Sequence, residues 1–165
     1  SPDLGVFRLA IFGSSLHWMD IDDVLKKTHG VLMPGGGVVV AGLRSIWGGP
    51  AAWELEVVGT VRQWLGSERR AGVVEFPRRQ RNFADAMSDA GFANVEEGEM
   101  ACVYEMDIPF IIGHLDTTSY CSRALLGDRA EAFEADLTDR LLQMQPEGVF
   151  EWRPSISYLF ADRPG

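Results

Sequence analysis

Two short apolar segments, separated by a helix-length stretch and a glycine-rich turn, constrain the fold of this chain most. The first is Val6–Gly13 (VFRLAIFG) and the second is Val38–Leu43 (VVVAGL). Apolar runs bounded by glycine are typical of strands covered on both faces in a parallel sheet. Between them, Asp20 offers an N-cap and apolar residues recur at helical spacing. Residues 1–43 therefore predict a βαβ unit with a right-handed crossover.

The rest of the chain alternates between helical and strand-like patterns. Helices are predicted from Pro50 to Leu65, from Asn82 to Ala90, within Ile108 to Tyr120, and from Asp128, which forms a capping-box pattern with Glu131. Strands are predicted within Phe92–Met106 and Val149–Ala161, where Pro154 indicates a bulge or an edge position. Residues 67–81 are polar and arginine-rich, which favours a surface loop. We expect one α/β domain over residues 1–165, with an α+β portion at 44–165.

Composition excludes several classes of function. The chain has 165 residues and a formal charge of −9, which argues against nonspecific binding to nucleic acid or to an anionic membrane. Cys102 and Cys121 do not make a disulfide framework, so a reducing compartment, the cytoplasm, is expected. The three histidines and two cysteines show no spacing typical of metal ligands, and we expect no metal site.

The text LAIFGSSLHWMDIDDVLKKTHGVLMPGGGVVVAGL, residues 9–43, resembles class I S-adenosylmethionine-dependent methyltransferases. It is most similar to the small-molecule branch that includes trans-aconitate methyltransferase-like proteins, through Leu16-His17-Trp18 and the turn Leu32–Gly36. The resemblance implies a partial Rossmann-like sheet holding the fourth to seventh strands of the family pattern. The family's glycine-rich loop and the acidic residue that ends its second strand are absent. We therefore expect a C-terminal half, truncated at its N-terminus and incomplete for binding the cofactor on its own.

The same resemblance implies roles for individual residues. The turn after the first strand, with Gly13, Ser14, Ser15, Leu16 and Trp18, would contact S-adenosylmethionine in the complete domain. The acceptor would meet His17, Trp47, His114, Ser119 and Tyr120, and His17 is also a candidate catalytic base. Structural alternatives stay open: His17 and Trp18 also suit packing residues that end the strand, and His114, Ser119 and Tyr120 suit a surface helix.

Two functions of different classes follow. The first is S-adenosylmethionine-dependent methyl transfer to a small-molecule acceptor. The second is a non-catalytic methyltransferase-like fragment or subunit that acts through association. In both, an apolar first strand without an outer neighbour predicts a partner at that edge, either the missing N-terminal half or a second copy. A nicotinamide dehydrogenase is a weaker alternative, because the dinucleotide loop is also missing.

Overall fold

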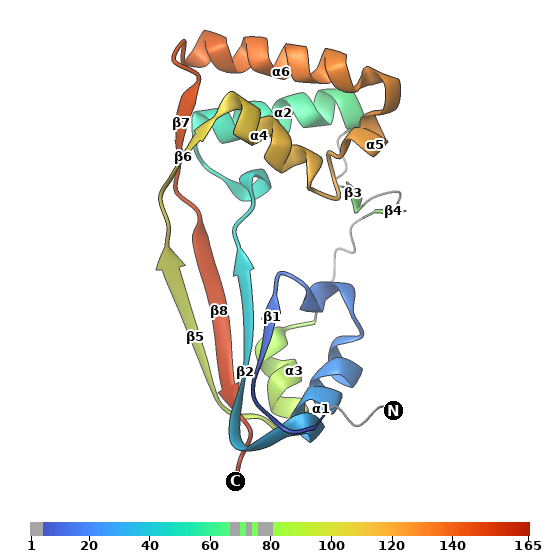
Figure 1. The fold of residues 1–165 in the computed structure, drawn as a ribbon, viewed down its shortest axis with the longest axis vertical. Coiled ribbons are helices and arrows are strands. Elements are labelled where there is room, and N and C mark those ends of the chain that lie inside the picture. The colour runs from blue at the N-terminus through green and yellow to red at the C-terminus, as the bar shows by residue number, and fades with distance from the viewer. Residues whose placement is uncertain (1–4, 67–69, 72–73, 76–80) are drawn as a thin grey trace. The chain divides into compact units, whose positions relative to one another are not determined.

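The structure is a computed structural model that describes residues 5–66, 70–71, 74–75 and 81–165 (Figure 1). Its contacts divide the chain into two compact units. Unit 1 comprises Ser1–Arg44, Arg79–Ala101 and Ser155–Gly165, and unit 2 comprises Ser45–Arg78 and Cys102–Pro154. The expectation of a single domain over residues 1–165 stays a prediction.

Unit 1 is a four-stranded mixed sheet with helices on one face. Its elements are β1 (Phe7–Gly13), α1 (Ile21–Val31), β2 (Leu32–Leu43), α3 (Phe83–Asp89), β5 (Ala93–Ala101) and β8 (Ser155–Asp162). The strand order is β1-β2-β8-β5 (Figure 1). β1 and β2 are parallel, whereas β8 lies between β2 and β5 and is antiparallel to both. This confirms the α/β class and the partial sheet with flanking helices.

The predicted βαβ unit is confirmed in detail. Ala10 lies opposite Val38, and Phe12 opposite Val40, in the parallel ladder. The Asp20 carboxylate caps α1 by accepting a hydrogen bond from the Asp23 N–H at 3.1 Å. β2 begins earlier than predicted, at Leu32, because the glycine-rich turn is itself extended and pairs partly with its neighbours. Within it, Gly35 has φ +73°, a conformation that glycine adopts without steric cost.

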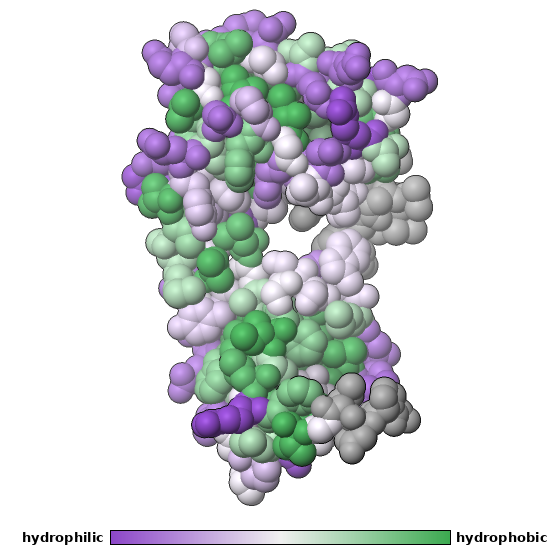
Figure 2. All heavy atoms as spheres, in the orientation of Figure 1, coloured by the Kyte–Doolittle hydropathy of each residue, from purple (hydrophilic) through white to green (hydrophobic). Residues whose placement is uncertain are grey.

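One face of the unit 1 sheet carries the core. Side chains from β2, β8 and both helices are buried together there, among them Leu25, Val38, Met87 and Ala161. The opposite face is open among the described residues, and Figure 2 shows apolar side chains gathered over β1 and β2. The expectation that the first strand is covered on both faces is therefore wrong for the described residues: strand alternation turns Ala10 and Phe12 inward and their neighbours outward.

Unit 2 is mainly helical. Its elements are α2 (Ala52–Leu65), β3 (Arg70–Ala71), β4 (Val74–Glu75), β6 (Tyr104–Asp107), α4 (Ile108–Asp116), α5 (Arg123–Leu126), α6 (Ala130–Met144) and β7 (Val149–Trp152). α2 and α4 each pack against α6, and β6 pairs with β7 in an antiparallel ribbon. The predicted loop at 67–81 lies largely outside the described residues, apart from the short β3–β4 pair. No helix in the described part of the chain combines the length and apolar character needed to cross a membrane.

The strands predicted within Phe92–Met106 are confirmed as β5 and β6, which belong to different sheets, while two details at Pro154 and at the start of α6 need correction. The pattern over Val149–Ala161 divides in the same way, and Pro154 lies in the break between β7 and β8 rather than in a bulge. The predicted capping box at the start of α6 does not form: Arg129 is the N-cap residue and makes no side-chain cap, because a 3₁₀ turn precedes the helix.

Candidate functional site

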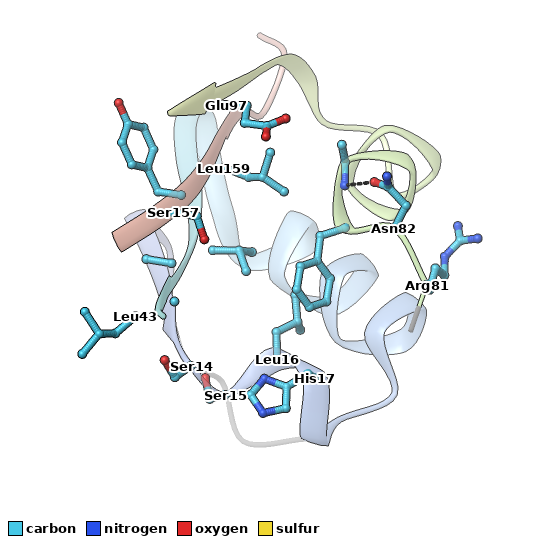
Figure 3. A pocket seen from close by; sticks show the side chains of 16 residues that line it. Ser14, Ser15, Leu16, His17, Leu43, Arg81, Asn82, Glu97, Ser157 and Leu159 are labelled. Carbon is cyan, nitrogen blue, oxygen red and sulfur yellow. Dashed lines mark hydrogen bonds between the residues drawn. The ribbon is translucent and has the colours of Figure 1, made fainter. Parts of the chain in front are cut away.

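A hollow of about 460 Å³ lies in unit 1, where the parallel strands β1 and β2 reach their carboxyl ends (Figure 3). Its lining comes from the turn after β1, the end of β2, the start of α3, and β5 and β8. The lining residues are Ser14–His17, Val40–Leu43, Arg81–Ala84, Glu97 and Ser157–Leu159. Open α/β sheets bind ligands outside the carboxyl ends of their strands, so this is the first place to look for a site.

The turn after β1 is held in an unusual conformation. Ser14 has φ +47°, in the left-handed region that residues other than glycine rarely adopt. Its backbone N–H donates a hydrogen bond to the Ala41 carbonyl at 2.8 Å, which fixes the turn across the end of β2. Leu16 anchors the next turn, since its side chain is only 1% exposed. A costly backbone conformation at the mouth of a hollow is typical of functional turns.

His17 and Trp18 follow in a 3₁₀ turn (Leu16–Trp18). Their ring centroids are 5.0 Å apart, and His17 is half-buried along the hollow. Trp18 is 54% exposed and lies outside the lining, as does Gly13, which ends β1. The structure thus brings Ser14, Ser15, Leu16 and His17 to one hollow, and their binding roles stay predictions.

The wall formed by β5 and β8 carries polar groups that the sequence reasoning missed. Glu97 lies opposite Leu159, so both side chains share one side of the sheet (Figure 3). Its carboxylate has no hydrogen-bond or ion-pair partner among the residues that the structure describes. Ser157, also exposed, adds a hydroxyl to the same wall. No local motif marks these residues, because only the register between β5 and β8 places them at the hollow.

Arg81 is the one arginine in the lining, and two carboxylates already hold it. Its Nε lies 2.7 Å from Asp22 and its Nη2 lies 2.5 Å from Asp89. The hydrogen bond with Asp89, followed by the charge of Asp22, raises the pKa of Arg81 above its usual value. The guanidinium is therefore engaged with its own chain. Its neighbour Asn82 is engaged too, because its side-chain oxygen caps α3 through the N–H groups of Ala84 and Asp85.

The other predicted acceptor contacts belong to unit 2, and two of them, Trp47 and Tyr120, are in contact there. Trp47 packs edge to face on the buried Tyr120, with ring centroids 5.1 Å apart. His114 instead lies 5.7 Å from the ring of Trp152, and burial lowers the pKa of its imidazole. Ser119 is exposed in the turn that follows α4. No observation tests the binding roles of these four residues, which remain predictions.

The hollow has groups suited to bind and orient a small polar molecule. It presents hydroxyls, one imidazole and one carboxylate above an apolar floor that includes Leu16 and Leu159. Hydroxyls donate and accept hydrogen bonds, and a neutral imidazole does both. Such a set can position an acceptor or move a single proton.

Comparison with solved structures shows the fold. A candidate type II methyltransferase from Anaeromyxobacter dehalogenans aligns with 97% of this chain at 15% identity, with a TM-score of 0.56. This chain covers 65% of that protein. The chain has this methyltransferase fold.

Two further solved structures align less well. A candidate methyltransferase from Bacillus halodurans has a TM-score of 0.45 at 13% identity, and the alignment covers 96% of this chain and 70% of that one. The Haemonchus contortus phosphoethanolamine N-methyltransferase 2, in complex with phosphomonomethylethanolamine and S-adenosylhomocysteine, has a TM-score of 0.41 at 14% identity. The alignment covers 96% of this chain but 34% of that enzyme. No family profile and no curated protein matches the sequence.

Proposed function

We propose that this chain takes part in S-adenosylmethionine-dependent methyl transfer to a small-molecule acceptor, as the second half of a methyltransferase domain of the trans-aconitate methyltransferase-like branch. One observation carries the proposal. The order β1-β2-β8-β5, with β8 antiparallel, supports it, because the resemblance implies the fourth, fifth, seventh and sixth strands of the family pattern in this order. The hollow lies at the carboxyl ends of the first two, where such a sheet binds its ligands.

The residues present fit only part of the methyl donor. The Ser14 turn exposes small side chains and backbone to a ligand, and Gly13, Ser15, Leu16 and Trp18 flank it. S-adenosylmethionine, when bound, supplies a methyl group on a positively charged sulfur. We propose that a second element, carrying the glycine-rich loop that the resemblance implies, holds the ribose and the methionine end.

The chain's own residues would then act on the acceptor. His17 lies at the hollow and would orient the acceptor or take one proton from it. Trp47, His114, Ser119 and Tyr120 of unit 2 are proposed as further acceptor contacts. Methyl transfer depends mainly on alignment and exclusion of water, so loss of His17 is expected to slow the reaction rather than abolish it.

The proposal includes a partner at the edge of β1. Among the described residues β1 pairs with β2 alone, and Val6, Phe7, Leu9 and Ile11 are 45–68% exposed. An exposed apolar edge strand favours pairing with another strand. We propose that the first half of a methyltransferase sheet, or a second copy of this chain, covers it. We also propose the cytoplasm as the location, because two cysteines, Cys102 and Cys121, do not make a disulfide framework.

The same edge supports the second candidate function, a non-catalytic subunit that acts through association. Calorimetric titration with S-adenosylhomocysteine, followed by amide NMR, separates the two. Binding that shifts the amides of Ser14–His17, by the chain alone or with a supplied first-half fragment, is the result expected of the enzyme. If the chain associates with that fragment but binds no S-adenosylhomocysteine, either alone or with the fragment, the result would contradict the methyltransferase proposal and favour the non-catalytic subunit.

A further inference from the structure

We propose that the hollow of unit 1 selects an acceptor that carries a protonated amine, and that Glu97 recognises its charge. This assignment of acceptor class rests on the proposed function. It concerns recognition: the ammonium group serves as a handle by which the molecule is held against the β5–β8 wall. The argument comes from the charges, the surroundings and the orientation of the lining residues.

The charge of the hollow is the first step. The lining includes two charged residues, Arg81 and Glu97. Arg81 forms ion pairs with Asp22 and Asp89, and these three residues together carry a net charge of one negative unit. Glu97 then adds a carboxylate that has no partner within the described part of the chain. Glu99, two residues further along β5 on the same face, adds another negative charge nearby. An acidic acceptor would be repelled here, whereas a cation would be attracted.

The surroundings of Glu97 strengthen that preference. Leu159 lies opposite it across the ladder, and Leu16, Val40 and Phe83 contribute further apolar lining. An ion pair beside apolar walls is screened less than one in open water. The ring of Phe83 also offers an aromatic surface, which attracts cations. A ligand with an ammonium group and an apolar body therefore matches both parts of the hollow.

A hydroxyl on the same wall offers the ammonium group a further hydrogen-bond acceptor. An ammonium group has three N–H donors and no acceptor, so it needs oxygens around it. Glu97 provides the charged acceptor, and Ser157 on β8 adds a hydroxyl to the same wall of the hollow (Figure 3). Hydrogen bonds between charged groups are about twice as strong as neutral ones, so Glu97 is expected to dominate.

Three ligands of nearly equal shape test the charge preference on the full 165-residue chain: benzylammonium, benzyl alcohol and benzoate. Binding is followed by the amide NMR shifts of Ser14–His17 and Asn82–Ala84. Benzylammonium is expected to bind about tenfold more tightly than the alcohol, as one charged hydrogen bond would give. Benzoate is expected to bind more weakly than either.

Two matched variants assign the effect to one side chain. Glu97→Gln keeps the shape and removes the charge, and it should weaken benzylammonium binding about tenfold while leaving benzyl alcohol unchanged. Glu96→Gln is the control, because Glu96 is paired with Phe160 on the other face of β5. It should bind like the parent chain. A dispersed amide spectrum of each variant shows that the fold is intact.

Two results would overturn the proposal: equal binding of the amine and the alcohol, or a Glu97→Gln variant that binds the amine as the parent chain does. A third arm adds S-adenosylhomocysteine. If it displaces benzylammonium, the cation site belongs to the methyl donor and the assignment to the acceptor fails. If the amine binds and S-adenosylhomocysteine does not, even with a first-half fragment, amine recognition stands and the proposed methyl transfer fails.

Discussion

Both units expose large apolar side chains, but in unit 2 these are spread over several elements, among them Leu55 in α2, Phe110 in α4 and Leu142 in α6, whereas in unit 1 several of them gather at β1. The described core of unit 2 has seventeen buried side chains, most of them from α2, α4, α5, α6 and the β6–β7 ribbon, and that of unit 1 has nine. In unit 1, four large apolar residues stay exposed side by side on and just before β1. The difference supports the proposal of a partner at β1.

The two units also differ in the surroundings of one carboxylate each, Glu54 in unit 2 and Glu97 in unit 1. In unit 2, Glu54 is only 2% exposed, and its carboxylate accepts hydrogen bonds from Trp152 Nε1 at 3.0 Å and the Ala51 N–H at 3.0 Å. Buried carboxylates are stable only when they are bonded in this way. In unit 1, Glu97 is exposed at a hollow. One carboxylate thus belongs to the architecture, and the other is placed to meet a ligand.

The largest expected effect is a loss of stability, and it is seen by comparing a buried isoleucine in unit 2 with an exposed one in unit 1. Ile111 in α4 is fully buried, and Ile111→Ala should destabilise unit 2 by about 3 kcal/mol through lost burial and a new cavity. Ile11 in β1 is 65% exposed, and Ile11→Ala should cost less than about 1 kcal/mol. Amide hydrogen exchange in α4 and β2 measures both. Equal losses would show that a further part of the protein covers the β1 face.

The next effect tests the tight packing of unit 2 around its buried carboxylate. A Cβ on Gly49 would lie 1.9 Å from the Glu54 carboxyl group, whereas a Cβ on Gly48 meets nothing within 4 Å. Gly49→Ala should therefore cost about 2 kcal/mol from overpacking, and Gly48→Ala should be close to neutral. Chemical denaturation followed by tryptophan fluorescence reports the change. Similar midpoints for the two variants would contradict the described position of Glu54.

A smaller effect concerns helix ends. Asp20 caps α1 in unit 1, so Asp20→Ala should cost about 1 kcal/mol. In unit 2, Arg129 makes no side-chain cap for α6, and Arg129→Ala should change helix capping little; its contact with the Trp64 carbonyl is at the surface. Thermal melts of the two variants give the comparison. If Arg129→Ala lowered the melting temperature more than Asp20→Ala, the surface contact of Arg129 would contribute more stability than the Asp20 cap, which contradicts the prediction.

The smallest effect is a dependence on pH in unit 2. Burial lowers the pKa of His114 below its ordinary 6.5, so the unfolded chain takes up the proton more readily. The stabilising contribution of neutral His114 is present above about pH 6.5 and is lost as the pH falls through the lowered pKa. An NMR titration should give a midpoint below 6.5, and His114→Gln should remove that part of the pH dependence. A midpoint at or above 6.5 would mean that the imidazole is well solvated.

The sequence was sufficient for the local elements of unit 1 but not for its surfaces. Apolar runs, the Asp20 cap and the Gly35 turn predicted the β1–α1–β2 path, because each depends on neighbours in the chain. The open face of β1 was missed, since a run of apolar residues looks the same whether one or both of its faces are covered. Covering depends on distant segments.

The candidate site shows the same limit. The turn at Ser14–His17 was predicted, because it follows a strand and carries small and polar residues. Glu97 and Ser157 were not, because they meet there only through the pairing of β5 with β8, far apart in the sequence. Likewise, the sequence gives little sign of the two breaks that separate β5 from β6 and β7 from β8. Only the second break carries a local signal, Pro154.

Amide hydrogen exchange along β1, measured together with sedimentation at increasing protein concentration and with a first-half fragment, tests the half-sheet claim most directly. We predict that alternate amides between Phe7 and Gly13 exchange rapidly in the dilute monomer, since one edge of the strand is unpaired. They should become protected as the edge is covered. A chain that stays monomeric at high concentration and with the fragment present, with an unchanged exchange pattern, would contradict the account.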